Sequence, residues 1–333
     1  MTARFPTPPV DDFAITELVQ TRMATPMAAL AQEVGLLELL DEAPKTIDEV
    51  AGLLQVTSRA AEAMVAVVAA LKFLAPVGGG RFTPTALGRT YLMAASPFRR
   101  QMCPPADPAL ARLRQAFRQT EPPVPLAVSM GTLPPDRVRA FIDQMHAVTL
   151  PAADSLSRLP IFTRLRSLLD VGAGSGSLAS GIAARHPGIR CTLLDLPQVC
   201  AIAAEHVAAY GLEDRITIVP ADMFRDAWPS GHDAVLFGNI FHDWDRATCV
   251  TLAAKASSVL GPGGVILLHE APLDDEKDGP LTVACFSVSM LLHERGKQYT
   301  RRELKDVLTE AGFVDFESTV SHGDHHLMSA RKP

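Results

Sequence analysis

Apolar residues recur at two different spacings in the two halves of the chain. From about Ile15 to Leu74 they return every three or four positions, as in MAALAQEVGLLELL and AEAMVAVVAALKFL, which predicts amphipathic helices. After about Pro160, short continuous apolar runs such as RSLLDVGAG and GGVILLHEAP alternate with helical stretches. This alternation predicts an α/β fold with a mostly parallel sheet that is covered by helices on both faces.

Residues 1–100 are expected to form a mainly α winged-helix domain. Thr46 and Glu49 fit a capping box at the start of one short helix, and Ser58 fits the cap of the next. The glycine-rich run LAPVGGGRFTPTALGRTYL then fits two short strands joined by a turn, which would be the wing. Because these helices carry few Lys or Arg residues, we expect a homodimer through this domain rather than binding to DNA.

Residues 101–160 begin with proline-rich stretches, PPADP, EPPVP and LPP, and continue as a helical pattern, RVRAFIDQMHAVTLPAADSLSRL. We expect them to form a helical connector that contributes to a ligand pocket. Residues 161–333 contain the alternating strands and helices and are expected to form the second domain. A parallel sheet binds ligands beyond the carboxyl ends of its strands, so polar residues at those ends are the candidates for function.

Composition narrows the possible partners. Of the 333 residues, 47% are hydrophobic and 20% are charged, and 31 basic against 37 acidic residues leave a net charge of -6 without any dense basic block. Nucleic acid is therefore not expected as a partner. The first residues lack the layout of a signal peptide and no apolar run is long enough to span a membrane, so a cytoplasmic location is expected. The five cysteines lack CxxC spacing, which excludes a cysteine-based zinc site.

A glycine-rich turn follows the first predicted strand of the second domain. In residues 170–176, DVGAGSG, a glycine stands at every second position between a strand and a helix, which lets the backbone approach a ligand closely. Asp195 ends the next strand, where a carboxylate can accept hydrogen bonds from ribose hydroxyls, and Asp222 ends the third. No basic residue in or beside the turn is placed to meet phosphate. The pattern favours a nucleoside with a neutral or cationic group.

Six motifs together extend this interpretation: DVGAGSG, LLDLP, ADMF, FHDW, LGPGGVILLHE and GKQYTRRELKDVLTEAGF. With these motifs in this order, the chain resembles the S-adenosylmethionine-dependent methyltransferases of the caffeic acid and hydroxyindole O-methyltransferase family. The resemblance covers essentially the whole chain. The resemblance implies a winged-helix dimerisation domain followed by a Rossmann-like catalytic domain. It also implies that S-adenosylmethionine is bound by Asp170, Gly172, Gly174, Asp195, Leu196, Asp222, Met223, Phe224 and Asn239. Gly238 departs from the lysine that plant members often carry.

The FHDW motif contains the residue that performs acid–base chemistry in this family. There the histidine removes the proton of a phenolic hydroxyl as that hydroxyl attacks the cofactor methyl, and by resemblance His242 is this general base. Glu270 matches the acid that orients it, and a histidine held by a carboxylate is a sensible proton acceptor. The substrate is expected to be a small molecule. By resemblance its pocket is lined by Arg118, Met145, His146, Phe286 and Met290.

His293 departs from the family pattern, because relatives that methylate aromatic hydroxyls carry an apolar residue at this position. It shares one helical stripe with Phe286 and Met290, and an imidazole aimed into a pocket is costly unless it finds a partner. His242, His293 and Asp243 together make a two-histidine, one-carboxylate set with coordination positions left open. Whether Asp243 is a ligand, a partner of a ligand or the base stays open.

Such a set resembles that of bacterial C-methyltransferases that act on 2-oxo acids. A C–H beside a ketone is far less acidic than a phenol, so a Lewis acid is needed to stabilise the enolate. The main expectation is therefore methylation at C3 of an aromatic or branched-chain 2-oxo acid in bacterial secondary metabolism. The expected metal is a divalent or ferric ion, with iron, zinc, cobalt and nickel all open.

Three alternatives compete with this expectation. The first is a metal-free O-methyltransferase of a phenolic small molecule, with His242 as the general base. The second is a winged-helix regulator that senses S-adenosylmethionine, which the scarcity of basic residues in the first domain disfavours. The third is a family member that has lost methyl transfer and uses the cofactor otherwise, which the intact FHDW motif and Glu270 disfavour. Three histidines near the end of the chain, His322, His325 and His326, are expected at the surface.

Overall fold

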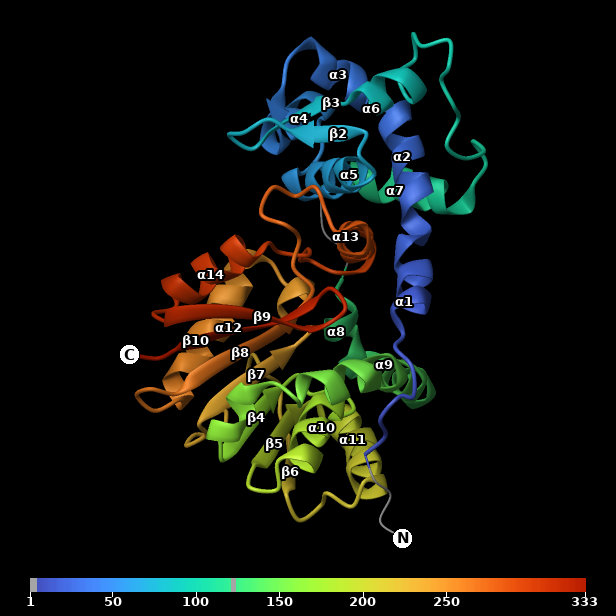
Figure 1. Ribbon diagram of the computed structural model, residues 1–333. Coiled ribbons are helices and arrows are strands. Elements are labelled where there is room, and N and C mark those ends of the chain that lie inside the picture. Colours follow the sequence, from blue (N-terminus) through green and yellow to red (C-terminus); the bar gives the residue numbers. More distant parts are fainter. Residues whose placement is uncertain (1–4, 121–123) are drawn as a thin grey trace. The chain divides into compact units, whose positions relative to one another are not determined.

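The structure is a computed structural model that describes residues 5–120 and 124–333. The chain divides into two compact units (Figure 1). Of the described residues, the sheet unit comprises 5–12, 126–271 and 303–333. The helical unit comprises 13–120, 124–125 and 272–302.

The sheet unit is built on one seven-stranded sheet with the order β6-β5-β4-β7-β8-β10-β9. The first five of these strands run parallel, and β10 pairs antiparallel with both β8 and β9. Most residues of strands β4, β7 and β8 are buried, and most of these are apolar, as expected for strands covered on both faces. The strands are β4 (Ser167–Val171), β5 (Arg190–Asp195), β6 (Ile216–Pro220), β7 (Ala234–Gly238), β8 (Val265–Glu270), β9 (Val314–His322) and β10 (His325–Arg331).

Helices cover both faces of this sheet. Figure 1 shows α10 (Ser177–Arg185) and α11 (Pro197–Ala209) on one face, and α12 (Arg246–Val259) and α14 (Arg301–Glu310) on the other. The long helix α9 (Pro135–Leu156) packs on α10 and α11. The predicted α/β fold with a mostly parallel sheet is thus confirmed.

The helical unit combines short helices with a small antiparallel sheet. The predicted capping box is present. The Thr46 hydroxyl accepts a hydrogen bond from the Glu49 backbone N–H, and the Glu49 carboxylate accepts one from the Thr46 backbone N–H. Thr57, and not Ser58, caps the next helix, because its hydroxyl accepts from the backbone of Ala60. The wing strands pair as predicted, and Lys45–Thr46 adds a third strand in the order β1-β3-β2.

The bounds of this unit's elements complete the description. Among the described residues, no single helix is long and apolar enough to cross a membrane, and only the bent pair α4 and α5 reaches that composition when taken together. The elements are α1 (Phe13–Gln20), η1 (Thr21–Met23), α2 (Ala24–Glu33), α3 (Leu36–Glu42), β1 (Lys45–Thr46), α4 (Ile47–Leu54), α5 (Ser58–Ala70), β2 (Leu74–Pro76), β3 (Arg81–Pro84), α6 (Ala86–Tyr91), α7 (Pro108–Arg118) and α13 (Leu281–His293).

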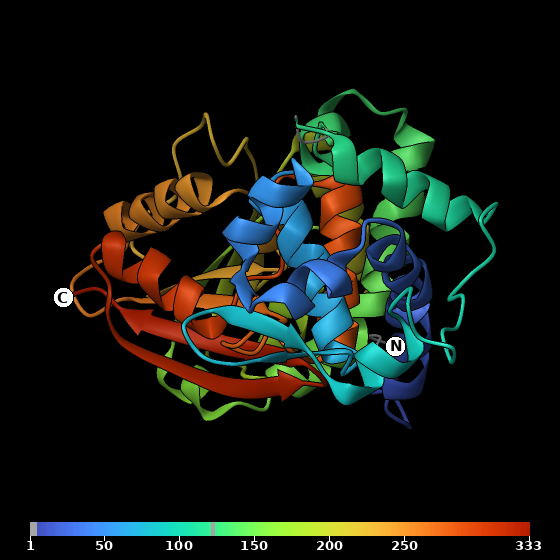
Figure 2. The same ribbon diagram turned by 90° about the horizontal axis from the view of Figure 1, so that it is seen from above.

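The compact units differ from the expected boundaries at residues 100, 160 and 161. Residues 272–302 belong with the helical unit, because the apolar helix α13 packs along α5 (Figures 1 and 2). Residues 126–160 belong with the sheet unit, because α9 packs on α10. Each helix buries apolar surface against its partner, and the partner of α13 is distant in sequence, so chain order does not delimit the units.

Candidate active site

The glycine-rich turn connects β4 to α10. Gly172, Gly174 and Gly176 all have positive φ, at 69°, 56° and 74°, which other residues adopt only with strain. A Cβ at Gly172 would lie 2.4 Å from the Ile240 side chain, whereas one at Gly174 would meet nothing within 4 Å. The turn therefore packs against the start of the FHDW segment at one glycine and faces open space at another.

Asp195 lies at the end of β5 beside this turn. Its Oδ2 accepts from the Gly174 backbone at 2.7 Å and its Oδ1 accepts from the Leu196 backbone at 2.7 Å. Burial nevertheless raises the pKa of Asp195 to about 6. Asp170, only 2% exposed, lies below the turn, and burial together with the charge of Asp195 raises its pKa to about 7.

The next strand end adds a further carboxylate. Asp222 Oδ1 accepts from the backbone of Phe224 at 2.8 Å, and the carbonyl of Met223 accepts from Trp228 and Lys255. Phe224 is 41% exposed. This edge of the sheet fits a nucleoside with a cationic group, as in S-adenosylmethionine. It offers carboxylates at successive parallel strand ends, an exposed aromatic ring, and a glycine turn that lets the backbone come close to a ligand. A side chain at Gly238 would lie 2.3 Å from Leu178, which explains why a lysine does not fit here without rearrangement.

His146, expected in the substrate pocket, is instead bonded to the glycine-rich turn. Its Nδ1 lies 2.9 Å from the hydroxyls of both Ser175 and Ser177, and its Nε2 lies 2.8 Å from Tyr210 Oη. Burial, followed by the nearby His206, lowers the pKa of His146 to about 4. The neutral imidazole thus ties α9 to the turn, while the neighbouring Met145 is half-buried.

His242 lies in the short 3-10 helix Phe241–Asp243, after β7, and is buried. Its Nδ1 lies 3.0 Å from Glu270 Oε2, and its Nε2 lies 3.3 Å from Asp243 Oδ1. Glu270 is itself held, because its Oε1 accepts from the backbone N–H groups of Ile240 and Phe241 at 2.9 and 2.7 Å. Burial lowers the pKa of His242, but the charges of Glu270 and Asp243 outweigh it and raise the pKa to about 10.

His293 has quite different neighbours at the end of α13, in the helical unit. Its Nε2 lies 3.1 Å from an Arg112 guanidinium nitrogen, which can only donate, and its Nδ1 lies 3.0 Å from the Ser289 carbonyl, which can only accept. The ring is therefore neutral, with its hydrogen on Nδ1. Desolvation lowers the pKa of His293, and Arg112 and Arg22 lower it further. Phe286, Met290 and the exposed Arg118 belong to this same unit.

The expected metal centre of His242, His293 and Asp243 needs correction. Within residues 5–120 and 124–333, no three His, Cys, Asp or Glu side chains are grouped so that they could hold a metal ion. The physical reason is that the two imidazoles are engaged elsewhere, one with two carboxylates and the other between a guanidinium and a carbonyl. An Nε2 that accepts from arginine has no lone pair left for a metal.

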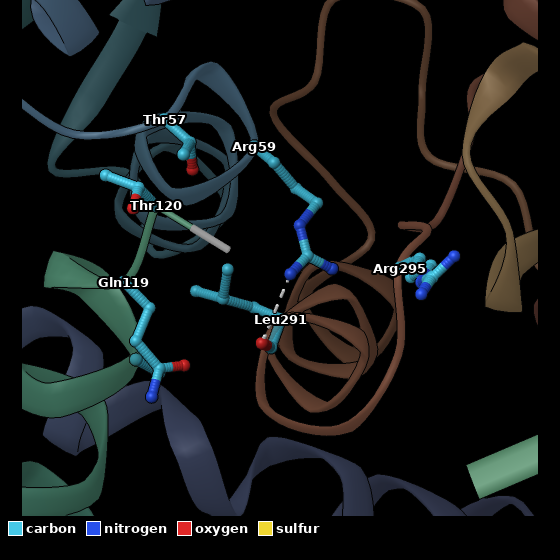
Figure 3. A pocket seen from close by; sticks show the side chains of 7 residues that line it. Thr57, Arg59, Gln119, Thr120, Leu291 and Arg295 are labelled. Carbon is cyan, nitrogen blue, oxygen red and sulfur yellow. Dashed lines mark hydrogen bonds between the residues drawn. The ribbon is translucent and has the colours of Figure 1, made fainter. Parts of the chain in front are cut away.

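Figure 3 shows a pocket of about 210 Å³ within the helical unit. Arg59 points across it and donates to the carbonyls of Met290 and Leu291 at 3.3 and 3.4 Å, so its guanidinium caps the last turn of α13. None of the residues predicted to form the site lines this pocket, whose walls are Thr57, Arg59, Ala116, Gln119, Thr120, Leu291 and Arg295.

One group of residues near His242 was not predicted. His325 was expected at the surface, but its ring stacks on the fully buried His269 at a centroid distance of 5.0 Å, and its Nε2 lies 3.2 Å from Asn239 Oδ1. The contact depends on β10 lying antiparallel beside β8, which no local sequence pattern indicates. His322 contacts Asp12 at 2.7 Å and Ser155 at 3.0 Å.

Comparisons with known proteins agree with this geometry. The family model described as O-methyltransferase domain matches residues 128–314. The chain is 33% identical over 305 residues to the 3-hydroxy-5-methyl-1-naphthoate 3-O-methyltransferase of Streptomyces sahachiroi, covering 90% of this chain and 88% of that protein.

Solved structures are similar over the whole chain. The O-methyltransferase family 2 protein from Planctomyces limnophilus, in complex with apigenin, matches with a TM-score of 0.90 at 26% identity, covering 100% of both chains. Human N-acetylserotonin methyltransferase, in complex with S-adenosylmethionine, matches with a TM-score of 0.62 at 24% identity, covering 96% of both chains. The second similarity concerns the fold alone.

Proposed function

The chain belongs to the O-methyltransferase family and is an S-adenosylmethionine-dependent methyltransferase, and from this premise we propose that it methylates a phenolic hydroxyl of an aromatic secondary metabolite. The observation that carries the proposal is the buried pair of His242 Nδ1 and Glu270 Oε2 at 3.0 Å. Because Nδ1 faces Glu270, we assign acceptance of the substrate proton to Nε2, which lies 3.3 Å from Asp243 Oδ1 in the resting protein.

The two carboxylates give His242 the basicity that this step requires. Glu270 Oε2 lies 3.0 Å from Nδ1, and Glu270 is itself fixed by two backbone N–H groups, so the carboxylate holds the ring in one orientation. With a pKa of about 10, the imidazole matches a phenol, whose pKa is also about 10. Proton transfer between matched groups is close to balanced in free energy. The resting ring is protonated, so the reaction rate is expected to rise with pH.

The bound cofactor supplies an electrophilic methyl group on a sulfonium. On the proposed assignment, the turn with Gly172 and Gly174 and the strand-end carboxylates Asp195 and Asp222 hold its nucleoside. The same assignment gives contacts to the cofactor from Asp170, Leu196, Met223, Phe224 and Asn239, and to the acceptor from Met145, Arg118, Phe286 and Met290. Asp243 raises the basicity of His242 from its Nε2 side, which is its proposed role.

C-methylation of a 2-oxo acid, the main expectation from the sequence, is not supported. That reaction starts from a C–H far less acidic than a phenol and calls for a Lewis acid, and the described side chains offer no ligand set for one. The alternative of a metal-free O-methyltransferase accounts better for the pair at His242. The relative that acts on a hydroxylated naphthoate supports a fused aromatic acceptor.

Incubation with methyl-labelled S-adenosylmethionine, EDTA and a panel of hydroxynaphthoates, flavonoids, catechols and 2-oxo acids tests the proposal. The expected products are S-adenosylhomocysteine and a labelled methyl ether of one of the phenols. A labelled 2-oxo acid that forms only after a metal is added would instead restore C-methylation.

Two further expectations stay proposals. Homodimerisation through residues 1–100 is tested by sedimentation of the purified protein, with a monomer as the contrary result. A cytoplasmic location is tested by fractionation of cells that produce the protein.

A further inference from the structure

A second pair of imidazoles lies next to Glu270 in the sheet unit. His269 precedes Glu270 in β8 and is fully buried, and His325 begins β10. Their rings stack with centroids 5.0 Å apart and planes 15° apart. The antiparallel pairing of β8 with β10 causes this arrangement, because Leu327 lies opposite His269 and His326 lies opposite Glu270 (Figure 1).

These residues converge on the turn that leads from β7 to His242. Asn239 has a positive φ of 54°, a left-handed conformation that asparagine tolerates better than most residues. Its backbone N–H donates to the His269 carbonyl at 2.9 Å, and its side-chain Oδ1 accepts from His325 Nε2 at 3.2 Å. The strained residue is therefore held at its backbone by β8 and at its side chain by β10.

The next two residues of the turn are held by Glu270. Ile240 and Phe241 both donate their backbone N–H groups to Glu270 Oε1, while Glu270 Oε2 faces His242. One carboxylate thus supports the turn with one oxygen and the imidazole with the other. Because Glu270 contacts both the turn and His242, the position of the turn and the contact between His242 and Glu270 share one carboxylate.

We propose that His325 is a positioning residue of the methyl-transfer reaction: its N–H to Asn239 fixes the turn that holds His242 against Glu270. The inference rests on the proposed function for the role of His242 as base, but the geometry that it concerns exists in the resting protein. His325 touches none of the reacting atoms and acts through Asn239.

A neutral His325 suits this role. Burial lowers its pKa to about 4, and the titratable groups that act on it are Glu270, His242, His322, Asp324 and, stacked on it, His269. At neutral pH His325 donates one hydrogen without a positive charge. Glu270 therefore interacts with the His242 cation without competition from a second cation beside it.

Three substitutions separate positioning from packing. His325→Phe keeps an aromatic face against His269 but removes the N–H, whereas His325→Gln supplies an N–H donor without the ring. His326→Phe is the matched control, because His326 lies on the same strand and its ring contacts Ser318 of the outer strand β9 at 3.0 Å.

The pKa of His242, measured by NMR titration of histidine labelled with nitrogen-15 in the resting enzyme, is the main readout. It is expected to fall by about one unit in His325→Phe, as the contact with Glu270 loosens, and to stay at the wild-type value in His325→Gln and His326→Phe. In turnover assays, kcat of His325→Phe should fall about tenfold with KM for the cofactor within about twofold, and its kcat against pH profile should move to lower pH.

The inference would be overturned if His325→Phe kept the His242 pKa and the kcat of the wild type. It would also be overturned if the His242 pKa fell equally in His325→Gln and His325→Phe. If His325→Phe does not fold, Asn239→Ala removes the same bond from its other end and is expected to give the same pKa fall, and an unchanged pKa would overturn the inference. The NMR readout needs no acceptor. If the wild type methylates no phenol while His325→Phe still shows the expected fall in the His242 pKa, the proposed function is refuted and the positioning role stays intact.

Discussion

His242 in the sheet unit and His293 in the helical unit are the same side chain with opposite surroundings. His242 lies between the carboxylates of Glu270 and Asp243, which raise its pKa to about 10 against the effect of burial. His293 contacts the Arg112 guanidinium and the Ser289 carbonyl, and its pKa is lowered by desolvation and by nearby arginines. One imidazole is held as a cation that can exchange a proton, and the other is held neutral.

The protonation state of a histidine therefore depends on the charged and hydrogen-bonding groups around it, and not on the residue type or its motif alone. Burial lowers the pKa of both rings, yet the net shifts have opposite signs because only one ring faces negative charge. His146 and His325 support the same conclusion, since both lack a bonded carboxylate and their pKa is lowered to about 4.

Replacement of His242, the proposed base, is expected to lower kcat more than any other substitution and so to distinguish it most clearly from His293. His242→Gln should lower kcat by about 10²- to 10⁴-fold, the range typical for removal of a positioned general base. Binding of S-adenosylhomocysteine, measured by calorimetry, should change little, because the glycine-rich turn is intact. Activity within about threefold of wild type would contradict the assignment of His242 as the base.

Removing the negative charge beside His242 should make it resemble His293. Glu270→Gln is isosteric and eliminates the larger of the two charges that raise the pKa of His242. We expect the kcat against pH profile to move to lower pH and kcat to fall by about 10- to 100-fold, as the ring loses its fixed tautomer. Asp243→Asn is the matched comparison and should move the profile less. An unmoved profile in both variants would show that the carboxylates do not set the basicity of His242.

The same charges should appear in the pH dependence of stability. The pKa of His242 is raised from 6.5 to about 10 on folding, so its pairing stabilises the protein fully below pH 6.5, and this stabilisation is lost as the pH rises through 10. Urea unfolding of the wild type between pH 6.5 and 10 should show this loss. Glu270→Gln should show a shallower dependence, and equal slopes would argue against the pairing.

The smallest effect is expected at His293. His293→Leu introduces an apolar residue, the type expected at this position from the resemblance to phenol methyltransferases. The variant should keep kcat and metal content within about twofold of wild type. Arg112→Gln is the companion variant, in which the pKa of His293 should rise because a positive charge is removed. Loss of both metal and activity in His293→Leu would bring back the metal-dependent mechanism.

Local patterns predicted much of the fold and part of the site. The alternation of apolar runs and helices predicted the parallel sheet, and the resemblance to the family, through the FHDW motif and Glu270, implied the pair that the structure places 3.0 Å apart. These features lie within one strand–turn–helix unit or at neighbouring strand ends, where spacing along the chain limits distance in space. Their spacing was therefore informative.

Other features depended on contacts that spacing does not encode. The helical stripe of Phe286, Met290 and His293 was correctly identified as helical, but the partner of His293 Nε2 is Arg112, 181 residues away, while only its Nδ1 has a local partner, the Ser289 carbonyl. His325 reaches Asn239 across 86 residues, through a register between β8 and β10. Burial and hydrogen bonding of both histidines were set by these distant neighbours.

The α/β class, the glycine-rich turn, the strand-end acids and the residue types available for acid–base chemistry follow from the order of residues along the chain. Which imidazole carries a charge, which stays neutral and which supports the turn at Asn239 depends on the packing of the folded chain. The physical reason is that periodicity and backbone preferences are local, whereas a pKa and a hydrogen-bond partner depend on charges and burial contributed by distant parts of the chain.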